Sequence, residues 1–148
     1  MRTVCMIPAR LNSKRVKKKN LRLINDKPLI SYVLDKLVNC ELFDDIYLNS
    51  ESLEFSQIAK DHGVKFYRRP EDLSSDNATN DQFTLDFMEK IPGDILVQVL
   101  PTSPLISLQE ICEFADMMKS GKYDTLISVE HKQIACLYKD REINFDKL

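Results

Sequence analysis

Glycine is scarce in this chain, and its distribution excludes two common nucleotide-binding motifs. Only 3 of the 148 residues are glycine, at Gly63, Gly93 and Gly121, so the first 62 residues contain none. A Walker A loop and a dinucleotide-binding fingerprint both need glycine to bring backbone amides against phosphate. Any phosphate bound near the start of the chain must therefore be held largely by side chains.

Long apolar runs, closely spaced cysteines and a strong net charge are also absent. No apolar stretch approaches the roughly 20 residues that span a bilayer, and the first one is too short for a secretory signal. The four cysteines, at Cys5, Cys40, Cys112 and Cys136, show no C-x-x-C spacing, which favours buried thiols in a reducing compartment. A formal net charge of −2 gives no reason to expect general nucleic-acid binding. We therefore expect a cytoplasmic protein without nucleic-acid or membrane partners.

Length and composition indicate one domain over residues 1–148. The chain is 43% hydrophobic and 30% charged, as is ordinary for a globular domain. A chain of this length can bury roughly 70% of the surface that it exposes when unfolded. It is therefore long enough for a sizeable core.

Strand and helix patterns alternate along the chain. Short apolar runs predict strands at residues 1–7, 46–48, 64–67, 94–100 and 125–129. Four helices are expected between them. The first is expected to be capped by Asp26, the second to cover residues 50–61, and the last two to begin at capping boxes at Thr79 and Ser107. Repeated βα units predict an α/β, Rossmann-like fold, with a mostly parallel sheet and helices on both faces.

The last 18 residues follow a different pattern. Residues 137–139 and 143–145 could form the two arms of a hairpin around residues 140–142.

The densest charge follows the first predicted strand. Seven of the 21 lysines and arginines lie between residues 10 and 22, and no acidic residue precedes Asp26. Ligands of open α/β sheets bind where the strands end at their carboxyl edge. The pattern predicts a site for a small polyanion such as a nucleoside triphosphate, with Arg10 as a planar fork, Lys19 as a point charge and Ser13 as a hydroxyl donor. A solvated basic face and an RNA-binding arm are the alternatives.

Three blocks of sequence carry a resemblance to a known family. The first block consists of four short segments, Ile7-Pro8-Ala9-Arg10, Ser13-Lys14, Lys19-Asn20-Leu21 and Lys27-Pro28-Leu29. The second block is residues 69–76, and the third is residues 101–105. Together they resemble the cytidylyltransferases that activate acidic sugars, in particular the CMP-sialic acid synthetase (acylneuraminate cytidylyltransferase) family. The likeness covers about residues 3–129 and implies a fold of the nucleotide-diphospho-sugar transferase type, truncated at its C-terminus.

The resemblance implies a nucleotidyltransferase that moves CMP from CTP to an acidic keto sugar, sialic acid or a related nonulosonic acid, and releases pyrophosphate. Arg10 and Lys19 would be catalytic, because fixed cations beside a breaking P–O bond stabilise the developing negative charge. The family implies nucleotide contacts at Pro8, Ala9, Arg10, Ser13, Lys19, Asn20, Arg69, Ala78 and Asn80. We place sugar contacts at Gln98, Thr102 and Ser103, near the end of a central strand.

The sequence departs from the family pattern in three ways. Glycines usual near Arg15 and near Asn25-Asp26 are missing, and the glutamine usual before the Pro-Thr-Ser-Pro block is Leu100, with Gln98 two residues earlier. The family is also normally longer, and its later part supplies a dimerisation arm and two aspartates that bind Mg²⁺. No Asp-x-Asp pair occurs here, so Mg²⁺ and a homodimer are implied by the family while no metal ligand is assigned. The alternatives are a truncated, non-catalytic nucleotide-binding or interaction module, and a cytidylyltransferase for another keto acid such as deoxyoctulosonate.

Overall fold

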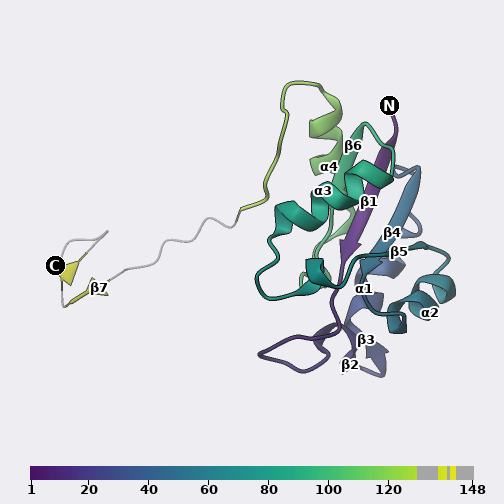
Figure 1. The fold of residues 1–148 in the computed structure, drawn as a ribbon. Coiled ribbons are helices and arrows are strands. Elements are labelled where there is room, and N and C mark those ends of the chain that lie inside the picture. The colour runs from purple at the N-terminus through teal and green to yellow at the C-terminus, as the bar shows by residue number, and fades with distance from the viewer. Residues whose placement is uncertain (130–136, 140, 143–148) are drawn as a thin grey trace.

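A four-stranded parallel sheet forms the centre of the structure, a computed structural model that describes residues 1–129, 137–139 and 141–142 (Figure 1). The strand order is β5-β4-β1-β6. Along β1, Cys5 lies opposite Ile46 of β4 and Val97 of β6. Four of the predicted strands are thereby confirmed, as β1 (Thr3–Pro8), β4 (Asp45–Ser50), β5 (Lys65–Arg68) and β6 (Ile95–Gln98).

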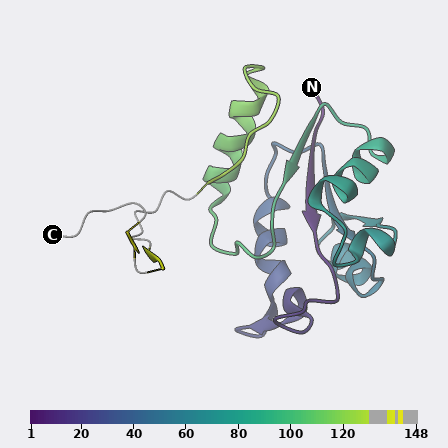
Figure 2. The same cartoon turned by 60° about the vertical axis from the view of Figure 1, so that its left-hand side comes forward.

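Alternate side chains of β1 enter two apolar layers, one on each face of the sheet. Cys5 and Ile7 belong to the larger layer, while Val4 and Met6 belong to the smaller one. Three helices, α1 (Leu29–Leu37), α2 (Glu54–Asp61) and α4 (Leu108–Lys119), pack on the larger layer. Helix α3 (Asn80–Lys90) covers the other face, opposite α1 and α4 (Figure 2). The predicted sheet with helices on both faces is confirmed.

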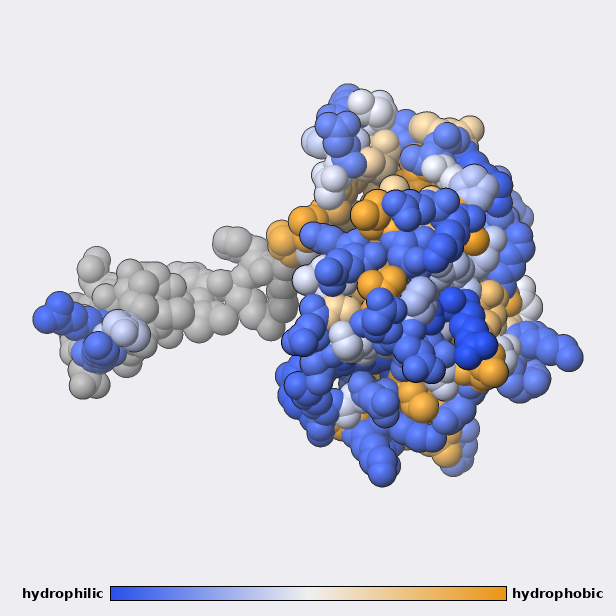
Figure 3. Space-filling view, viewed as in Figure 1, coloured by the Kyte–Doolittle hydropathy of each residue, from blue (hydrophilic) through white to orange (hydrophobic). Residues whose placement is uncertain are grey.

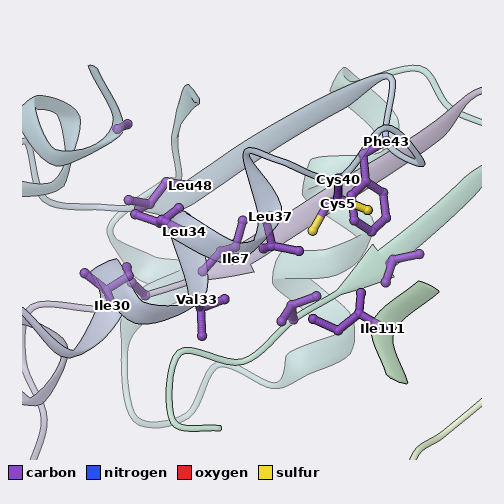
Figure 4. Packing of buried hydrophobic residues seen from close by; sticks show 14 of the residues in the cluster. Cys5, Ile7, Ile30, Val33, Leu34, Leu37, Cys40, Phe43, Leu48 and Ile111 are labelled. Carbon is purple, nitrogen blue, oxygen red and sulfur yellow. The ribbon is translucent and has the colours of Figure 1, made fainter. Parts of the chain in front are cut away.

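The larger layer fixes the carboxyl end of β1. Ile30, Val33 and Leu34 of α1 lie against Ile7 and Leu48 of the sheet (Figure 4), and all five side chains are fully buried. Full burial of each such side chain stabilises the fold by about 1.5–3 kcal/mol. The loop that leaves β1 therefore starts from a rigid position.

Both predicted capping boxes are present. Thr79 Oγ1 accepts a hydrogen bond from the Gln82 amide, and Gln82 Oε1 accepts one from the Thr79 amide. Ser107 and Glu110 make the same reciprocal pair at the start of α4. Among the described residues, no helix has the length and apolar character that crossing a membrane would require.

The first helix begins without the expected Asp26 cap. Asn25 and Asp26 instead form the turn of a small hairpin between β2 (Leu23–Ile24) and β3 (Lys27–Pro28), with φ values of 48° and 61°. Two successive left-handed residues are typical of a tight hairpin turn, and asparagine and aspartate tolerate that conformation better than most residues. The turn therefore forms without glycine.

Two further boundaries differ from the prediction. Helix α2 begins at Glu54 and not at Ser50, which is the last residue of β4. Leu53 is 56% exposed, while Phe55 is fully buried. Residues 51–53 are thus a loop at the carboxyl edge of the sheet, because Ser50 continues the parallel pairing as far as Arg68.

The prediction of a fifth strand at residues 125–129 is wrong. Residues 125–129 lie in the described part of the chain but form no strand, and Ile127 and Val129 are 78% and 85% exposed. An apolar pattern supplies a face to bury, but a strand also needs a neighbour whose backbone groups it can pair with.

The C-terminal hairpin differs from the expected one. Strands β7 (Leu137–Tyr138) and β8 (Arg141–Glu142) pair antiparallel, so Arg141 and Glu142 are strand residues and not turn residues. The left-handed conformation of Lys139, with φ of 50°, begins the tighter turn. The expected second arm at residues 143–145 lies outside the described residues.

Three cysteines lie within or beside the larger apolar layer. Cys5 and Cys40 are buried, and Cys112 is half-buried with its Sγ 3.5 Å from Cys40 Sγ. Burial raises the pKa of the Cys5 thiol far above its ordinary value. The expectation of buried thiols is confirmed for Cys5 and Cys40, and Cys136 lies outside the described residues.

Candidate functional site

A cavity of about 720 Å³ opens at the carboxyl ends of β1 and β6. Its volume falls within the range of small-molecule sites. Most residues assigned from the resemblance line it, namely Pro8, Ala9, Arg10, Ser13, Lys19, Asn20, Arg69, Asn80, Gln98 and Thr102. Ala78 and Ser103 do not. The other lining residues, which had no predicted site role, are Lys14, Arg15, Val16, Phe83, Leu100 and Pro101.

One wall of the cavity is the basic loop, defined here as residues 10–19. The Ala9 amide donates to the Asn49 carbonyl at 2.9 Å, which extends the pairing of β1 and β4 by one residue before the loop departs. The loop ends in a short 3₁₀ helix, η1 (Lys19–Leu21), preceded by Lys18 with φ of 51°. Hydrophilic side chains dominate the face shown in Figure 3, on which this loop lies. The basic segment therefore lies beside a cavity and is not an isolated solvated arm.

An aspartate from another segment already engages two of the loop cations. Arg10 Nη1 lies 3.2 Å from Asp76 Oδ1, and Lys14 Nζ lies 2.8 Å from Asp76 Oδ2. The hydrogen bond from Lys14, with a smaller contribution from Arg10, holds the pKa of Asp76 below its usual value. Asp76 is therefore negatively charged at neutral pH, at the place where a phosphate would approach these cations.

Lys19 and Lys18 differ in their surroundings. Lys18 Nζ pairs with Glu54 Oε2 at 2.9 Å on the surface. Lys19 lines the cavity, is partly buried, and forms no ion pair within the described ranges. Its ammonium group is thus available to an anion in the cavity, as is the guanidinium of Arg15, which also lines the cavity and forms no ion pair among the described residues.

Asn20 carries an unused hydrogen-bond acceptor. The residue is buried beside the cavity, and its Nδ2 lies 3.5 Å from the Arg10 carbonyl. Its Oδ1 is buried without a hydrogen-bond partner. Such a group costs about 1–3 kcal/mol when it is left unpaired. A donor on a bound ligand would remove that cost.

Arg69 is buried and not a surface ion-pair partner. Its Nη2 donates to the Ala9 carbonyl at 2.9 Å, and its Nε donates to Ser74 Oγ at 2.9 Å. The guanidinium lies 4.7 Å from the centre of the Phe83 ring, a cation–π distance. Burial lowers the pKa of Arg69, while Glu51 opposes that change. Arg69 thus fixes the backbone at the end of β1 as well as lining the cavity.

Sequence reasoning missed Glu51. Its Oε1 accepts a hydrogen bond from the Leu11 amide at 2.8 Å, and its Oε2 accepts one from Ser74 Oγ at 3.0 Å. Burial opposes its ionisation, but the hydrogen bonds from the Leu11 amide and its other partners outweigh burial and hold the pKa of Glu51 below its usual value. The available signal was its position directly after a strand that ends in the polar residues Asn49 and Ser50.

The opposite wall of the cavity comes from the end of β6 and the loop after it. Gln98 Nε2 donates to Asn80 Oδ1 at 2.7 Å, which joins β6 to the start of α3. Leu100, where the family usually has glutamine, is 49% exposed. Lys36 of α1 donates to the Pro104 carbonyl and, at 2.8 Å, to the Ile106 carbonyl. These hydrogen bonds fix the loop that follows β6 to α1. Sequence reasoning also missed this role of Lys36.

The described residues contain no cluster of metal-binding side chains. They contain no group of three or more histidine, cysteine, aspartate or glutamate side chains that could hold a metal ion. The acids that contact the basic loop, Asp76, Glu51 and Glu54, are already engaged by basic side chains or backbone amides. No step is therefore assigned to a metal ion held by these residues.

The fold is that of the nucleotidyltransferases. The structure of CMP:2-keto-3-deoxy-manno-octonic acid synthetase in complex with CTP superposes with a TM-score of 0.72 at 21% identity, over 81% of this chain and 48% of that one. A cytidylyltransferase from Leptospira borgpetersenii superposes with a TM-score of 0.67 at 23% identity, over 82% and 50%. At these identities the likeness shows the fold alone.

Within that class, the chain belongs to the cytidylyltransferase family, whose model matches residues 4–143. It is 32% identical over 135 residues to N-acylneuraminate cytidylyltransferase of Escherichia coli O18:K1:H7, covering 87% of this chain and 32% of that protein. It is 32% identical over 113 residues to pseudaminic acid cytidylyltransferase of Campylobacter jejuni serotype O:2, covering 72% and 49%. The chain thus spans between about a third and a half of the length of these relatives.

Proposed function

We propose that this chain binds CTP in the cavity beside the basic loop and transfers CMP to an acidic keto sugar, with release of pyrophosphate. The observation that carries the proposal is the placement of Arg10, Lys19 and Ser13 around one cavity at the carboxyl end of β1 in a member of the cytidylyltransferase family. The sugar's anomeric oxygen attacks the α-phosphorus, and the bond to the bridging oxygen breaks. The electron pair of that bond leaves with pyrophosphate, while the hydroxyl proton passes to solvent.

Arg10, Lys19 and Ser13 hold the triphosphate. Arg10 offers two parallel N–H donors to phosphate oxygens, and Lys19 offers a compact charge. Both cations counter the negative charge that grows on the leaving pyrophosphate, which is the main task of a protein in this kind of transfer. The pairing of Arg10 with Asp76 supports an anion-binding role, since Asp76 brings a carboxylate to the place proposed for phosphate.

Asn20 recognises the base. Its unpaired Oδ1 suits an amino group and its Nδ2 suits a carbonyl, so the side chain matches an edge that presents both, as cytosine does. Backbone groups of Pro8 and Ala9, together with Arg69, complete the nucleoside side of the cavity. Asn80 contacts the nucleotide from the start of α3, and we retain Ala78 as a proposed contact although it does not line the cavity.

The acceptor sugar lies against the end of β6. Gln98 and Thr102 line this wall, and Ser103 is close in sequence. The relatives are named for N-acylneuraminate and pseudaminic acid, and a structural neighbour is named for 2-keto-3-deoxy-manno-octonic acid. All three are keto sugar acids, so the proposal names that class and not one member.

The family implies Mg²⁺, and we propose that the active protein requires it. The metal would neutralise phosphate charge when bound. We assign no ligand for it among the described residues, which contain no group of three or more metal-binding side chains. We also propose that the protein forms a homodimer, as the family implies, and that residues 1–148 form a single domain. The alternative function is a nucleotide-binding module without turnover, and the lack of an acidic cluster among the described residues favours it.

Pyrophosphate release tests the proposal. The chain is incubated with CTP, Mg²⁺ and, in separate reactions, N-acetylneuraminate, pseudaminate or 3-deoxy-manno-octulosonate. Pyrophosphate that depends on both CTP and one sugar acid supports the enzyme. Calorimetric CTP binding without pyrophosphate supports the non-catalytic module, and absence of CTP binding overturns both functions.

A further inference from the structure

Three segments far apart in sequence meet at the carboxylate of Glu51. Its Oε1 accepts from the amide of Leu11, in the basic loop, at 2.8 Å. Its Oε2 accepts from Ser74 Oγ at 3.0 Å and from Arg69 Nη2 at 3.4 Å. Glu51 itself directly follows β4, so the central sheet fixes its position. One side chain thus joins the loops that follow β1, β4 and β5.

These contacts hold the backbone on both sides of Arg10. Arg69 Nη2, paired with Glu51, donates to the Ala9 carbonyl at 2.9 Å. Glu51 accepts from the Leu11 amide. The residue before Arg10 and the residue after it are therefore both bound to the same ion pair. Arg10 itself has a half-exposed side chain whose ion pair with Asp76 lies on the surface.

The pair is largely buried, unlike the other charge contacts to the loop. The side chain of Arg69 is 3% exposed and that of Glu51 is 14% exposed, whereas Lys18 and Glu54 are 47% and 46% exposed. An exposed pair contributes about 0.2–1 kcal/mol, while loss of one partner of a buried pair leaves an uncompensated charge. The Glu51 contacts are therefore strong enough to decide the conformation of residues 9–11.

From this geometry we propose that Glu51 is a positioning residue for phosphate binding. It does not line the cavity and acts by holding residues 9–11 so that the Arg10 guanidinium enters the cavity in one direction. A preorganised cation binds its anion without first losing conformational freedom, so the pair raises the affinity for the triphosphate. This inference rests on the proposed function, because the triphosphate is the ligand.

The test compares two isosteric substitutions in the full chain. Glu51→Gln keeps an oxygen for the Leu11 amide but presents N–H groups to Arg69 and Ser74, while Glu54→Gln removes only the surface pair with Lys18. Titration calorimetry at 10 °C, where both variants are checked to be folded by circular dichroism, measures CTP affinity. We expect Glu51→Gln to weaken CTP binding about tenfold and Glu54→Gln less than about twofold.

A purely structural role would lower the melting temperature of Glu51→Gln but leave the CTP affinity of the folded protein unchanged. Equal affinities of the two variants would overturn the inference. If Glu51→Gln does not fold, Ser74→Ala replaces it, because it removes one hydrogen bond to Glu51 and one to Arg69. We expect it to weaken CTP binding about threefold, and unchanged affinity would also overturn the inference.

Amide hydrogen exchange separates this inference from the proposed function. If the unsubstituted chain does not bind CTP, the proposed function fails, but exchange at Leu11 can still be measured. We expect the Leu11 amide to exchange about tenfold faster in Glu51→Gln than in Glu54→Gln. Equal exchange rates would show that Glu51 does not hold the loop.

Discussion

The rim and the floor of the cavity hold charge in opposite ways. The rim is Arg10, Lys14 and Lys19, whose side chains are exposed or half-exposed and whose only described acid partner is Asp76. The floor is defined as Ala9 and Arg69, which line the cavity, together with Glu51 and Ser74, which contact Arg69 without lining the cavity. One largely buried ion pair and three short hydrogen bonds join these separate loops. The rim cations can therefore exchange Asp76 for a ligand, while loss of one charged partner in the floor would cost a large part of the folding free energy.

This difference separates affinity from stability. Exposed ion pairs contribute little to folding, so rim substitutions should change binding and leave the unfolding free energy almost unchanged. Substitutions in the floor should lower the unfolding free energy in addition to their effect on binding, because removal of one member of a buried pair leaves the other desolvated and unpaired.

The largest effect is expected from Arg69→Ala. It leaves the Glu51 carboxylate without its buried cation and the Ala9 carbonyl without its donor. We expect the unfolding free energy to fall by about 3 kcal/mol, measured by urea denaturation. Arg68→Ala is the matched control, because Arg68 is adjacent in sequence but its side chain is exposed. We expect this substitution to lower the unfolding free energy by less than about 0.5 kcal/mol. Equal losses would show that the floor is no more stabilising than the surface.

Arg10→Ala should have the largest effect on binding. We expect CTP affinity to fall at least about tenfold by calorimetry, because a charge-assisted contact to phosphate is lost. The melting temperature should stay within about 2 °C of the parent, because the Asp76 pair is exposed. Lys17→Ala, at an exposed lysine that does not line the cavity, is the control and should bind CTP normally. Unchanged affinity in Arg10→Ala would remove this arginine from the phosphate site.

Glu51 should give the floor an acid-sensitive stability. Its folded pKa lies below its unfolded value of about 4.3, so its contribution is complete above that value and is lost as pH falls through the folded pKa. Urea unfolding between pH 3 and pH 7 should therefore show a smaller loss of stability at acid pH for Glu51→Gln than for the parent. If the unfolding free energies of Glu51→Gln and of the parent depended on pH in the same way, Glu51 would not be an ionised, hydrogen-bonded carboxylate in the folded protein.

The smallest expected effect is a gain in CTP affinity. Asp76→Asn removes the carboxylate that pairs with Arg10 and Lys14, so a triphosphate no longer has to displace it. We expect CTP to bind about threefold more tightly. Asp72→Asn, at an exposed aspartate in the same loop, should bind as the parent does. Weaker binding in Asp76→Asn would mean that Asp76 takes part in binding and does not oppose it.

The sequence was most informative where a local pattern has a local cause. Thr79 and Ser107 cap their helices as the capping-box pattern predicted, and the apolar runs became the four parallel strands. The cluster of basic residues after β1 lies beside the cavity, and the phosphate-binding role assigned to it stays a prediction. Local rules suffice for these features, because the groups that satisfy them are within a few residues.

The features that the sequence did not predict depend on long-range contacts. Glu51 looked like the start of a helix, because nothing nearby in sequence shows that Leu11 and Arg69 are its partners. The hairpin turn at Asn25-Asp26 replaced the expected helix cap for a similar reason, since β2 had to pair with β3. Residues 125–129 had a strand pattern but pair with no strand in the described part of the chain.

Calorimetric titration of the chain with CTP and with CMP, without added metal, tests most directly whether the basic loop holds the triphosphate. The account predicts that CTP binds at least about tenfold more tightly than CMP, because only CTP reaches both Arg10 and Lys19 with its outer phosphates, and that raising the salt concentration narrows the difference. Equal affinity for CTP and CMP, unaffected by salt, would contradict it.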